Sequence, residues 1–595
     1  MNLLEELNKL AASAFEKAGM DPAYGKITVS NRPDLSEYQC NGAMAAAKVY
    51  HKAPIQIANE VVPYLSEIEA FQDVNAVMPG FINLNVKAAY LRDFVATQAE
   101  KERFGAECPE KKKIVVDYGG PNVAKPLHIG HLRSAIIGES IKRILSFMGH
   151  ETIGDPHLGD WGLQIGLIIE RLKELYPDLP YFDASFTGEY PTEAPFTISE
   201  LETIYPEASK KSKEDPEFFN RAHENTVLLQ NGHPGYRAIW QHIIHVSVTD
   251  LKKNYDKLNV HFEMWKSESD AQPYIPDMIE RFKKDGIAYL SDGALVVDVA
   301  EETDKHEIPP CIVVKSDGGS LYATTDLATV IMRMEDLNPD GMIYLADKRQ
   351  DLHYTQFFRV SRKAGIVKPD TLLKFIGFGT MNGKDGKPFK TRDGGVMRLE
   401  TLISDVNNAV REKMKERYED GEVDEETAAK VALAAIKYGD LSNQATKDYN
   451  FDIDRFCSFE GNTGPYILYT IVRIKSILRK AGLYTDGAIT LDTLKNASAD
   501  FKGLTVDTPE LKALYKSITG FPPCMEAAMN ELAPHKVCVY LYELCDAFNG
   551  FYHETPILKE ENETLRAQYL SLITFVLRIL LSGIDVLGFE APEKM

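Results

Sequence analysis

The chain has 595 residues, of which 44% are hydrophobic and 26% are charged, and its formal net charge at pH 7 is −21. A chain of this length cannot be organised around one hydrophobic core, so we expect roughly three to five domains or subdomains. The excess of acidic residues argues against a protein that attracts nucleic acid by its net charge, and any RNA-binding surface must gather its basic residues locally.

The cysteines and the apolar segments indicate in which cellular compartment the protein functions. The seven cysteines are scattered without a CxxC pair, which argues against a zinc ribbon and a secreted disulfide framework. The N-terminal pattern is an acid-bearing amphipathic helix rather than a signal peptide. The apolar segment 570–589 is interrupted by Arg578 and Asp585, which disfavours a membrane span. We therefore expect a cytoplasmic protein with no membrane partner. Separately, we expect it to be a monomer.

The first 108 residues are expected to form a small α/β domain. The segment NGAMAAAKVY at 41–50 favours a helix. Further on, a Pro-Gly turn precedes the alternation of apolar and polar residues at 81–85, which predicts a strand.

The most informative stretch runs from residue 112 to residue 148. Its apolar run at 114–116 predicts a short buried strand, followed by a turn rich in Gly, Pro and Asn and a helix beginning near Gly130. Such a junction aims free backbone N–H groups and the positive end of a helix dipole at one point, which suits a phosphate. His128 and His131 flank Gly130 there, where imidazoles can bind phosphate oxygens and the glycine allows close approach of a nucleotide. The four-residue motif His-Ile-Gly-His alone is weak evidence for a nucleotide site, since the start of a surface helix can contain it by chance.

The wider block PNVAKPLHIGHLRS at 121–134 resembles the signature of class I aminoacyl-tRNA synthetases, in the form found in the arginyl-tRNA synthetases. The resemblance implies a multidomain α/β protein. Its parts would be an N-terminal additional domain (1–108), a Rossmann-type doubly wound parallel sheet (109–455) with an insertion at about 175–300, and an all-α helix-bundle anticodon-binding domain (456–595). The segment HLGDWGLQ at 157–164 matches the glycine-rich turn of the family. The implied activity is arginine–tRNA ligation, with L-arginine, ATP and tRNA-Arg as partners and Mg²⁺ carried by the ATP rather than held in a metal cage of the protein.

The second half of the nucleotide site is expected in MNGKDGKPFKTRDGG at 381–395. This segment resembles a degenerate form of the lysine loop of class I enzymes, in which Lys390 takes the place of the leaving-group lysine and Lys387 precedes it. Lys125, just before the histidines, matches a lysine that compensates for the degeneracy in arginyl enzymes. The resemblance thus implies His128, His131, Lys125 and Lys390 as catalytic residues, and His128, Gly130, His131, Lys387 and Lys390 as the ATP site. The alternative for the loop alone is a solvated surface hairpin.

Specificity for arginine requires carboxylates that face a planar guanidinium with five donors. Asp117 ends the predicted strand, and Asp326 follows Tyr322 at i, i+4 in LYATTDLA, so the latter two can share one helical face. The pattern resembles the arginine-recognising segment of the family. Gln350 matches the residue that holds the α-amino end of the substrate, and Asn122 completes the implied arginine site.

The C-terminal segment from about 456 shows helical periodicity almost throughout, which predicts a bundle joined by short loops. By resemblance, Phe81 and Asn83 approach the D-loop of the tRNA, and Tyr466, Tyr469, Arg473 and Met595 serve the anticodon end. The family resemblance also implies that tRNA must bind before arginine is activated.

Two other interpretations remain open at this point. One is another synthetase or nucleotidyltransferase with the His-Ile-Gly-His motif, which predicts different chemistry at Tyr322 and Asp326. The other is a synthetase-like RNA-binding protein without activity, which predicts damage to the histidine motif or loss of Lys390, and neither is seen.

Overall fold

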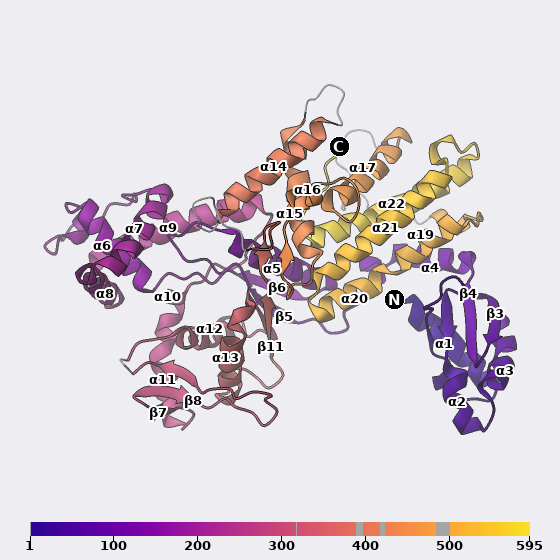
Figure 1. The fold of residues 1–595 in the computed structure, drawn as a ribbon, viewed down its shortest axis with the longest axis horizontal. Helices are drawn as coiled ribbons and strands as arrows, with labels where there is room; N and C mark the ends of the chain where they lie inside the picture. The colour runs from indigo at the N-terminus through magenta and orange to yellow at the C-terminus, as the bar shows by residue number, and fades with distance from the viewer. Residues whose placement is uncertain (1, 317, 388–396, 417–422, 484–499) are drawn as a thin grey trace.

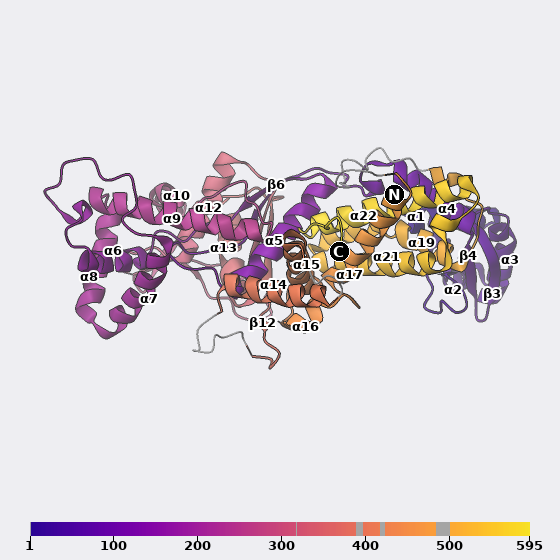
Figure 2. The ribbon, with the colours of Figure 1, turned by 90° about the horizontal axis from the view of Figure 1, so that it is seen from above.

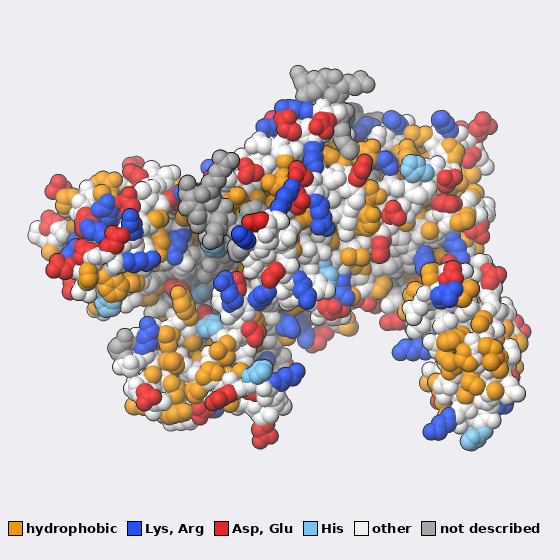
Figure 3. Space-filling view, viewed as in Figure 1, with side chains coloured by type: hydrophobic (Ala, Val, Ile, Leu, Met, Phe, Trp, Pro, Cys, Tyr) orange, Lys and Arg blue, Asp and Glu red, His pale blue; other side chains and the backbone are white. Residues whose placement is uncertain are grey.

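The computed structural model describes residues 2–316, 318–387, 397–416, 423–483 and 500–595. The chain is elongated (Figure 1), with an N-terminal module and a helical insertion at opposite ends and a parallel sheet between them. The view from above in Figure 2 places the C-terminal helices between that sheet and the N-terminal module. The space-filling view in Figure 3 has the same elongated outline as the ribbon.

The N-terminal module is an antiparallel sheet of four strands in the order β1-β2-β4-β3. Its strands are β1 (Ile27–Val29), β2 (Tyr38–Cys40), β3 (Phe71–Val77) and β4 (Phe81–Val86), and its helices are α1 (Leu3–Lys17), α2 (Gly42–Tyr50) and α3 (Pro54–Ser66). The predicted helix at 41–50 and the predicted strand at 81–85 are therefore present. Helix α4 (Ala88–Glu100) packs instead against the C-terminal bundle, where the side-chain amide of Gln98 donates to the carbonyl of Ile518 at 3.1 Å.

The central sheet confirms the predicted doubly wound architecture. Four parallel strands lie in the order β11-β10-β5-β6, namely β5 (Lys113–Asp117), β6 (Glu151–Asp155), β10 (Gly341–Asp347) and β11 (Leu372–Phe378). Val115 and Val116 in β5 are fully buried, which explains the short apolar run in the sequence. The strand order reverses between β5 and β10, so the carboxyl ends of these two strands open a crevice at the topological switch point.

Two insertions separate the halves of this sheet. The first is a cluster of helices, α6 (Leu163–Leu175), α7 (Ile198–Glu214), α8 (Pro216–Gln230) and α9 (Pro234–Lys257). The sequence predicted only a weakly patterned surface insertion at 175–225, but Thr197 and Glu200 form a capping box that starts α7, and Asp215 caps α8. The second insertion contains α10 (Glu268–Ala271), α11 (Ile275–Lys284) and the antiparallel strands β7 (Tyr289–Ser291), β8 (Ala294–Val297) and β9 (Cys311–Val314).

The nucleotide-fold helices and the bundle complete the chain. Helices α5 (Ile129–Met148), α12 (Tyr322–Asp336) and α13 (Asp351–Lys363) belong to the central sheet, and the short strands β12 (Met381–Asn382) and β13 (Tyr449–Asn450) pair in parallel. Helices α14 (Leu399–Lys415), α15 (Glu425–Leu441) and α16 (Ile453–Phe456) precede the predicted bundle. The bundle itself is formed by α17 (Gly464–Lys480), α19 (Pro509–Thr519), α20 (Phe521–Glu531), α21 (Pro534–Glu554) and α22 (Glu563–Val586). Helix α22 is long and apolar enough to cross a membrane, but 78% of its most apolar window is buried inside the protein, as in a core helix of the bundle.

Candidate active site

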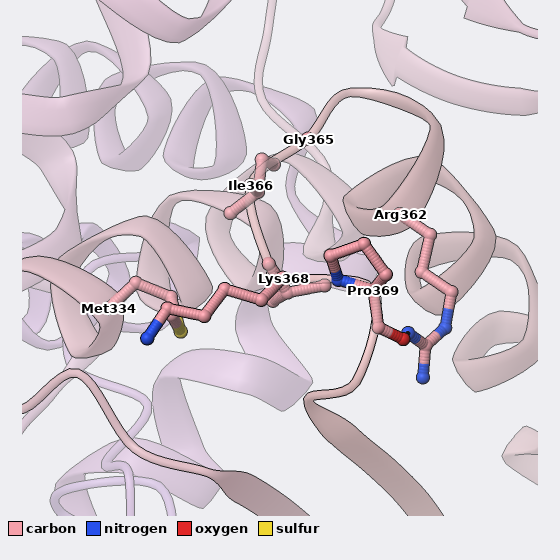
Figure 4. A pocket seen from close by; sticks show the side chains of 7 residues that line it. Met334, Arg362, Gly365, Ile366, Lys368 and Pro369 are labelled. Atoms are coloured by element: carbon pink, nitrogen blue, oxygen red, sulfur yellow. Dashed lines mark hydrogen bonds between the residues drawn. The ribbon is translucent and has the colours of Figure 1, made fainter.

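A cavity of about 1060 Å³ lies at the carboxyl ends of β5 and β10, at the switch point of the sheet. The sequence-predicted residues that line it are Asp117, Asn122, His128, Gly130, His131, Tyr322, Asp326 and Gln350. A smaller cavity of about 700 Å³ lies before the amino end of β11 (Figure 4), where the guanidinium of Arg362 donates to the carbonyl of Pro369 at 3.2 Å and Lys368 is one of the lining residues. Only the larger cavity contains predicted site residues.

The two histidines are held by the first turn of α5. His128 is the N-cap, and its Nδ1 accepts from the backbone N–H of Gly130 at 3.0 Å. Nδ1 of His131 accepts from the backbone N–H of His128 at 3.1 Å, and the two ring centroids lie 3.9 Å apart. Since a neutral imidazole carries one N–H, each ring bears its proton on Nε2. The pair therefore offers two donors beside the amino end of a helix.

Burial keeps both imidazoles neutral at physiological pH. It lowers the pKa of His128, with the charge of Lys125 acting in the same direction. Burial also lowers the pKa of His131 to about 3, and the charges of His128 and Lys125 add to that effect. The histidines can thus donate hydrogen bonds to phosphate oxygens without themselves changing charge.

The opposite wall is built by α12 and α13. Nε2 of His353 and Oδ2 of Asp326 lie 2.5 Å apart, which orients the carboxylate of Asp326. Tyr322 begins α12 and is 77% exposed, so it stands at the mouth of the cavity. Gln350 lies at the end of the short turn after β10. These groups reach the cavity from segments that lie on one side of the sheet.

Arg333 is a residue that the sequence reasoning missed. Its fully buried side chain donates from Nη2 to Oδ2 of Asp117 at 2.7 Å and to Oδ2 of Asp155 at 2.6 Å. Burial raises the pKa of Asp117, although the charge of Arg333 acts in the opposite direction. The pKa of Asp155 is lowered, because its hydrogen bonds and the nearby positive charge of Arg333 outweigh the effect of burial. The arginine could have been found from its spacing, because it lies seven residues after Asp326 on the same face of α12.

Two further groups at the cavity were also missed. Nε2 of His157 lies 3.1 Å from the hydroxyl of Thr329, one turn before Arg333. Glu268 lines the cavity from α10, and burial raises its pKa to about 7. No motif spacing identified Glu268, because it arrives from the second insertion.

Unlike the two histidines, Lys125 and Lys387, which were predicted to serve the ATP site, do not line the cavity. Nζ of Lys125 lies 4.7 Å from the ring centroid of Tyr205 on α7, and Lys125 is not among the residues that line the cavity. Lys387 is exposed in a turn, where its backbone N–H donates to Asp385 and its carbonyl accepts from Gly383. Lys390 lies outside the described residues. The assignment of these lysines stays a prediction.

None of the residues predicted to contact tRNA is among those that line the cavity. Asn83 is only 6% exposed, and its side-chain oxygen Oδ1 accepts from the side-chain amide of Gln39 at 3.0 Å, while Phe81 is half-buried. In the bundle, the guanidinium of Arg473 lies 4.8 Å from the ring centroid of Tyr469. Asn549 links Arg473 to the hydroxyl of Tyr466, with distances of 2.6 and 2.9 Å. Met595 packs half-buried against the bundle core.

Three models of known protein families match successive parts of the chain. A model of the catalytic domain of class I (R) tRNA synthetases matches residues 94–453, which defines the protein as a class I tRNA synthetase. The DALR anticodon binding domain matches residues 467–595, and the arginyl-tRNA synthetase N-terminal domain matches residues 3–86. The chain belongs to the arginyl-tRNA synthetase family.

Individual relatives match the chain over its full length. The chain is 58% identical to the arginine–tRNA ligase of Agathobacter rectalis and 52% identical to that of Alkaliphilus oremlandii, with 100% of each chain covered. Among solved structures, the arginyl-tRNA synthetase of Plasmodium falciparum superimposes with a TM-score of 0.77 at 25% identity, covering 100% of this chain and 99% of that one. The Thermus thermophilus enzyme has the same fold, with a TM-score of 0.75 at 23% identity and 100% of both chains covered.

Proposed function

We propose that this protein joins L-arginine to tRNA-Arg in two steps driven by ATP. In the first step, a carboxylate oxygen of arginine bonds to the α-phosphorus of ATP, and pyrophosphate leaves. In the second, a hydroxyl of the 3′-terminal ribose of the tRNA attacks the activated carbonyl, and AMP leaves. The observation that carries the proposal is one cavity in which two imidazole donors at a helix start face a wall containing Asp326 and Tyr322.

The nucleotide side of the reaction needs fixed positive groups, because negative charge grows on the departing pyrophosphate. Nε2–H of His128 and Nε2–H of His131 supply two donors, and the amino end of α5 adds the field of its dipole. We assign Lys390 to the leaving phosphates, with Lys387 and Lys125 as supporting cations, and Mg²⁺ arrives with the ATP.

The arginine side uses carboxylates that match a planar cation. Asp326 is oriented by His353 and reaches the cavity beside Tyr322. We assign the guanidinium to Asp326 and Asp117, because a fork of N–H donors can pair with two carboxylates at once. Asn122 and Gln350 line the same cavity and are assigned to the α-amino and carboxylate end.

The tRNA is assigned to both ends of the elongated chain. Phe81 and Asn83 in the N-terminal module would meet the D-loop, and Tyr466, Tyr469, Arg473 and Met595 would meet the anticodon. Aromatic rings beside a cation are suited to stacking with exposed bases. We further propose that the protein acts as a monomer in the cytoplasm, and light scattering should give the mass of one chain.

The decisive experiment is aminoacylation of total tRNA with each amino acid offered in turn. We expect charging with arginine alone, with ATP converted to AMP and pyrophosphate. Charging with a different amino acid would identify a synthetase of another specificity. Binding of tRNA without any charging would identify a non-catalytic RNA-binding protein.

A further inference from the structure

The guanidinium of Arg133 joins three segments at the wall of the active-site cavity. Arg133 lies in the second turn of α5, two residues after His131, and its side chain is 1% exposed. Its Nε donates to Oδ2 of Asp440 at 3.0 Å. Its Nη1 donates to the carbonyl of Gly379 at 2.6 Å and to the carbonyl of Lys447 at 3.1 Å. One side chain thus connects the histidine-bearing helix with segments 246 and 314 residues away in sequence.

Asp440 orients that guanidinium from the side of the bundle. It lies in the last turn of α15, is also 1% exposed, and accepts a second hydrogen bond from the hydroxyl of Tyr449 at 2.8 Å. The ring of Tyr449 lies under the guanidinium, with its centroid 5.0 Å from the central carbon of Arg133. Because α15 packs against both α5 and α17, the ion pair is held in a rigid environment.

The segment that Arg133 holds forms part of the cavity wall. Gly379, Thr380 and Met381 line the cavity directly after β11. The backbone N–H of Gly379 donates to the carbonyl of Ala445 at 2.9 Å. A Cβ added to Gly379 would lie 2.5 Å from the carbonyl oxygen of Lys447, so a glycine is required for this close approach.

We propose that Arg133, oriented by Asp440, is a positioning residue for ATP, because it sets the spacing between the histidines at the start of α5 and the cavity wall formed by Gly379–Met381. This inference rests on the proposed function. A displaced wall would change the fit of the nucleotide between these two elements. The fit of arginine would change less, because Tyr322 and Asp326 come from α12.

The test is a comparison of steady-state constants for Asp440→Asn and for the wild type, with ATP and arginine varied separately. The variant keeps the size of the side chain and removes the charge that orients Arg133. We expect the KM for ATP to rise about 10- to 100-fold, since small misplacements of reacting groups cost that much, while the KM for arginine stays within about twofold. Arg133→Lys, which keeps the charge but loses the planar fork, should shift the KM for ATP in the same direction.

A matched control separates positioning from stability. Glu139 lies on the same helix, is 2% exposed and pairs with Arg143 at 2.7 Å, but it does not line the cavity. Glu139→Gln should lower the thermal midpoint without raising the KM for ATP selectively. Tyr449→Phe keeps the ion pair and removes the hydroxyl that bonds to Asp440 and lies 2.9 Å from Sδ of Met381 in the cavity wall. It allows the assay if Asp440→Asn is too unstable, and it should raise the KM for ATP several-fold.

The inference is overturned if both KM values in these Arg133, Asp440 and Tyr449 variants stay at wild-type levels or rise equally. It is also overturned if Glu139→Gln reproduces the ATP effect. These outcomes differ from a failure of the proposed function, in which the wild type itself does not charge tRNA with arginine.

Discussion

Arginine specificity should depend most directly on the carboxylate of Asp326. Removal of one member of a buried charge pair costs about 3–5 kcal/mol, or roughly 10²–10³-fold or more in affinity. Asp326→Asn should therefore raise the KM for arginine sharply and leave the KM for ATP little changed. The wild type should likewise reject citrulline, which is neutral and nearly isosteric. Steady-state charging assays measure both effects.

The matched control for this prediction is Asp304→Asn. Asp304 is likewise a carboxylate with a basic side chain as its partner, since it accepts from Arg359 at 2.6 Å, but it does not line the cavity. Its KM for arginine should equal that of the wild type. Equal use of arginine and citrulline by the wild type would refute the assignment of Asp326.

Arg333 is expected to be a strong determinant of stability, because it is the shared cation of Asp117 and Asp155. Arg333→Met would leave the buried carboxylate of Asp155 and the half-buried carboxylate of Asp117 without it, at a cost of about 3–5 kcal/mol in the free energy of unfolding. Because the pKa of Asp155 is lower in the folded protein than in the unfolded chain, the charged carboxylate stabilises the folded state at pH values above the unfolded-state pKa. This stabilisation is lost as the pH falls and the carboxylate is protonated. The deficit of the variant should therefore shrink in acid, as urea unfolding at several pH values can measure.

Arg359→Met provides the comparison for Arg333→Met. Arg359 is more exposed than Arg333 and pairs with Asp304 closer to the surface, so its loss should cost clearly less than the loss of Arg333. Similar losses in both variants would show that burial does not distinguish the two ion pairs.

At the scale of single elements, helix α17 carries the predicted anticodon site. Tyr469 and Arg473 lie one turn apart, and the guanidinium sits over the ring. Stacking of a base on an aromatic ring is worth about 1–3 kcal/mol, so Tyr469→Ala should weaken charging about ten- to a hundredfold through the KM for tRNA. Tyr469→Phe keeps the ring and should behave like the wild type. An unchanged KM in Tyr469→Ala would remove α17 from the tRNA site.

At the scale of the whole molecule, the N-terminal module should be separable from the rest after Val86. Helix α4 must stay, because Gln98 bonds to the bundle and the ring of Phe104 packs 5.5 Å from that of Phe521. Deletion of residues 1–86 should raise the KM for tRNA while the remaining chain stays folded, as circular dichroism can check. Charging at the wild-type level would contradict docking of tRNA at both ends.

Activation of arginine is expected to depend on the tRNA itself. Arginine-dependent exchange between ATP and pyrophosphate should be near background without tRNA and appear when cognate tRNA is added, because Pro388 and Phe389 alter the usual lysine-loop sequence and the bound tRNA would supply a population shift. Lys390→Ala should abolish exchange in both conditions, since loss of a transition-state donor costs about 2.7–4 kcal/mol. Robust exchange by enzyme freed of tRNA would end this expectation.

Sequence alone determined the features that are local in the chain. The buried strand, the turn and the histidine-bearing helix follow one another within 112–148, and their apolar run, breakers and periodicity identify them without any distant contact. The pair Tyr322 and Asp326 and the helices of the bundle were predicted for the same reason. The family resemblance then ordered these elements into domains.

Only the tertiary structure decided which distant residues meet. Arg333 reaches Asp117 and Asp155 because the order of the parallel strands places β5 and β6 beside α12. Arg133 reaches Asp440, which lies 307 residues away, because α15 packs on α5. Such partnerships depend on strand order and helix packing, which local periodicity does not encode.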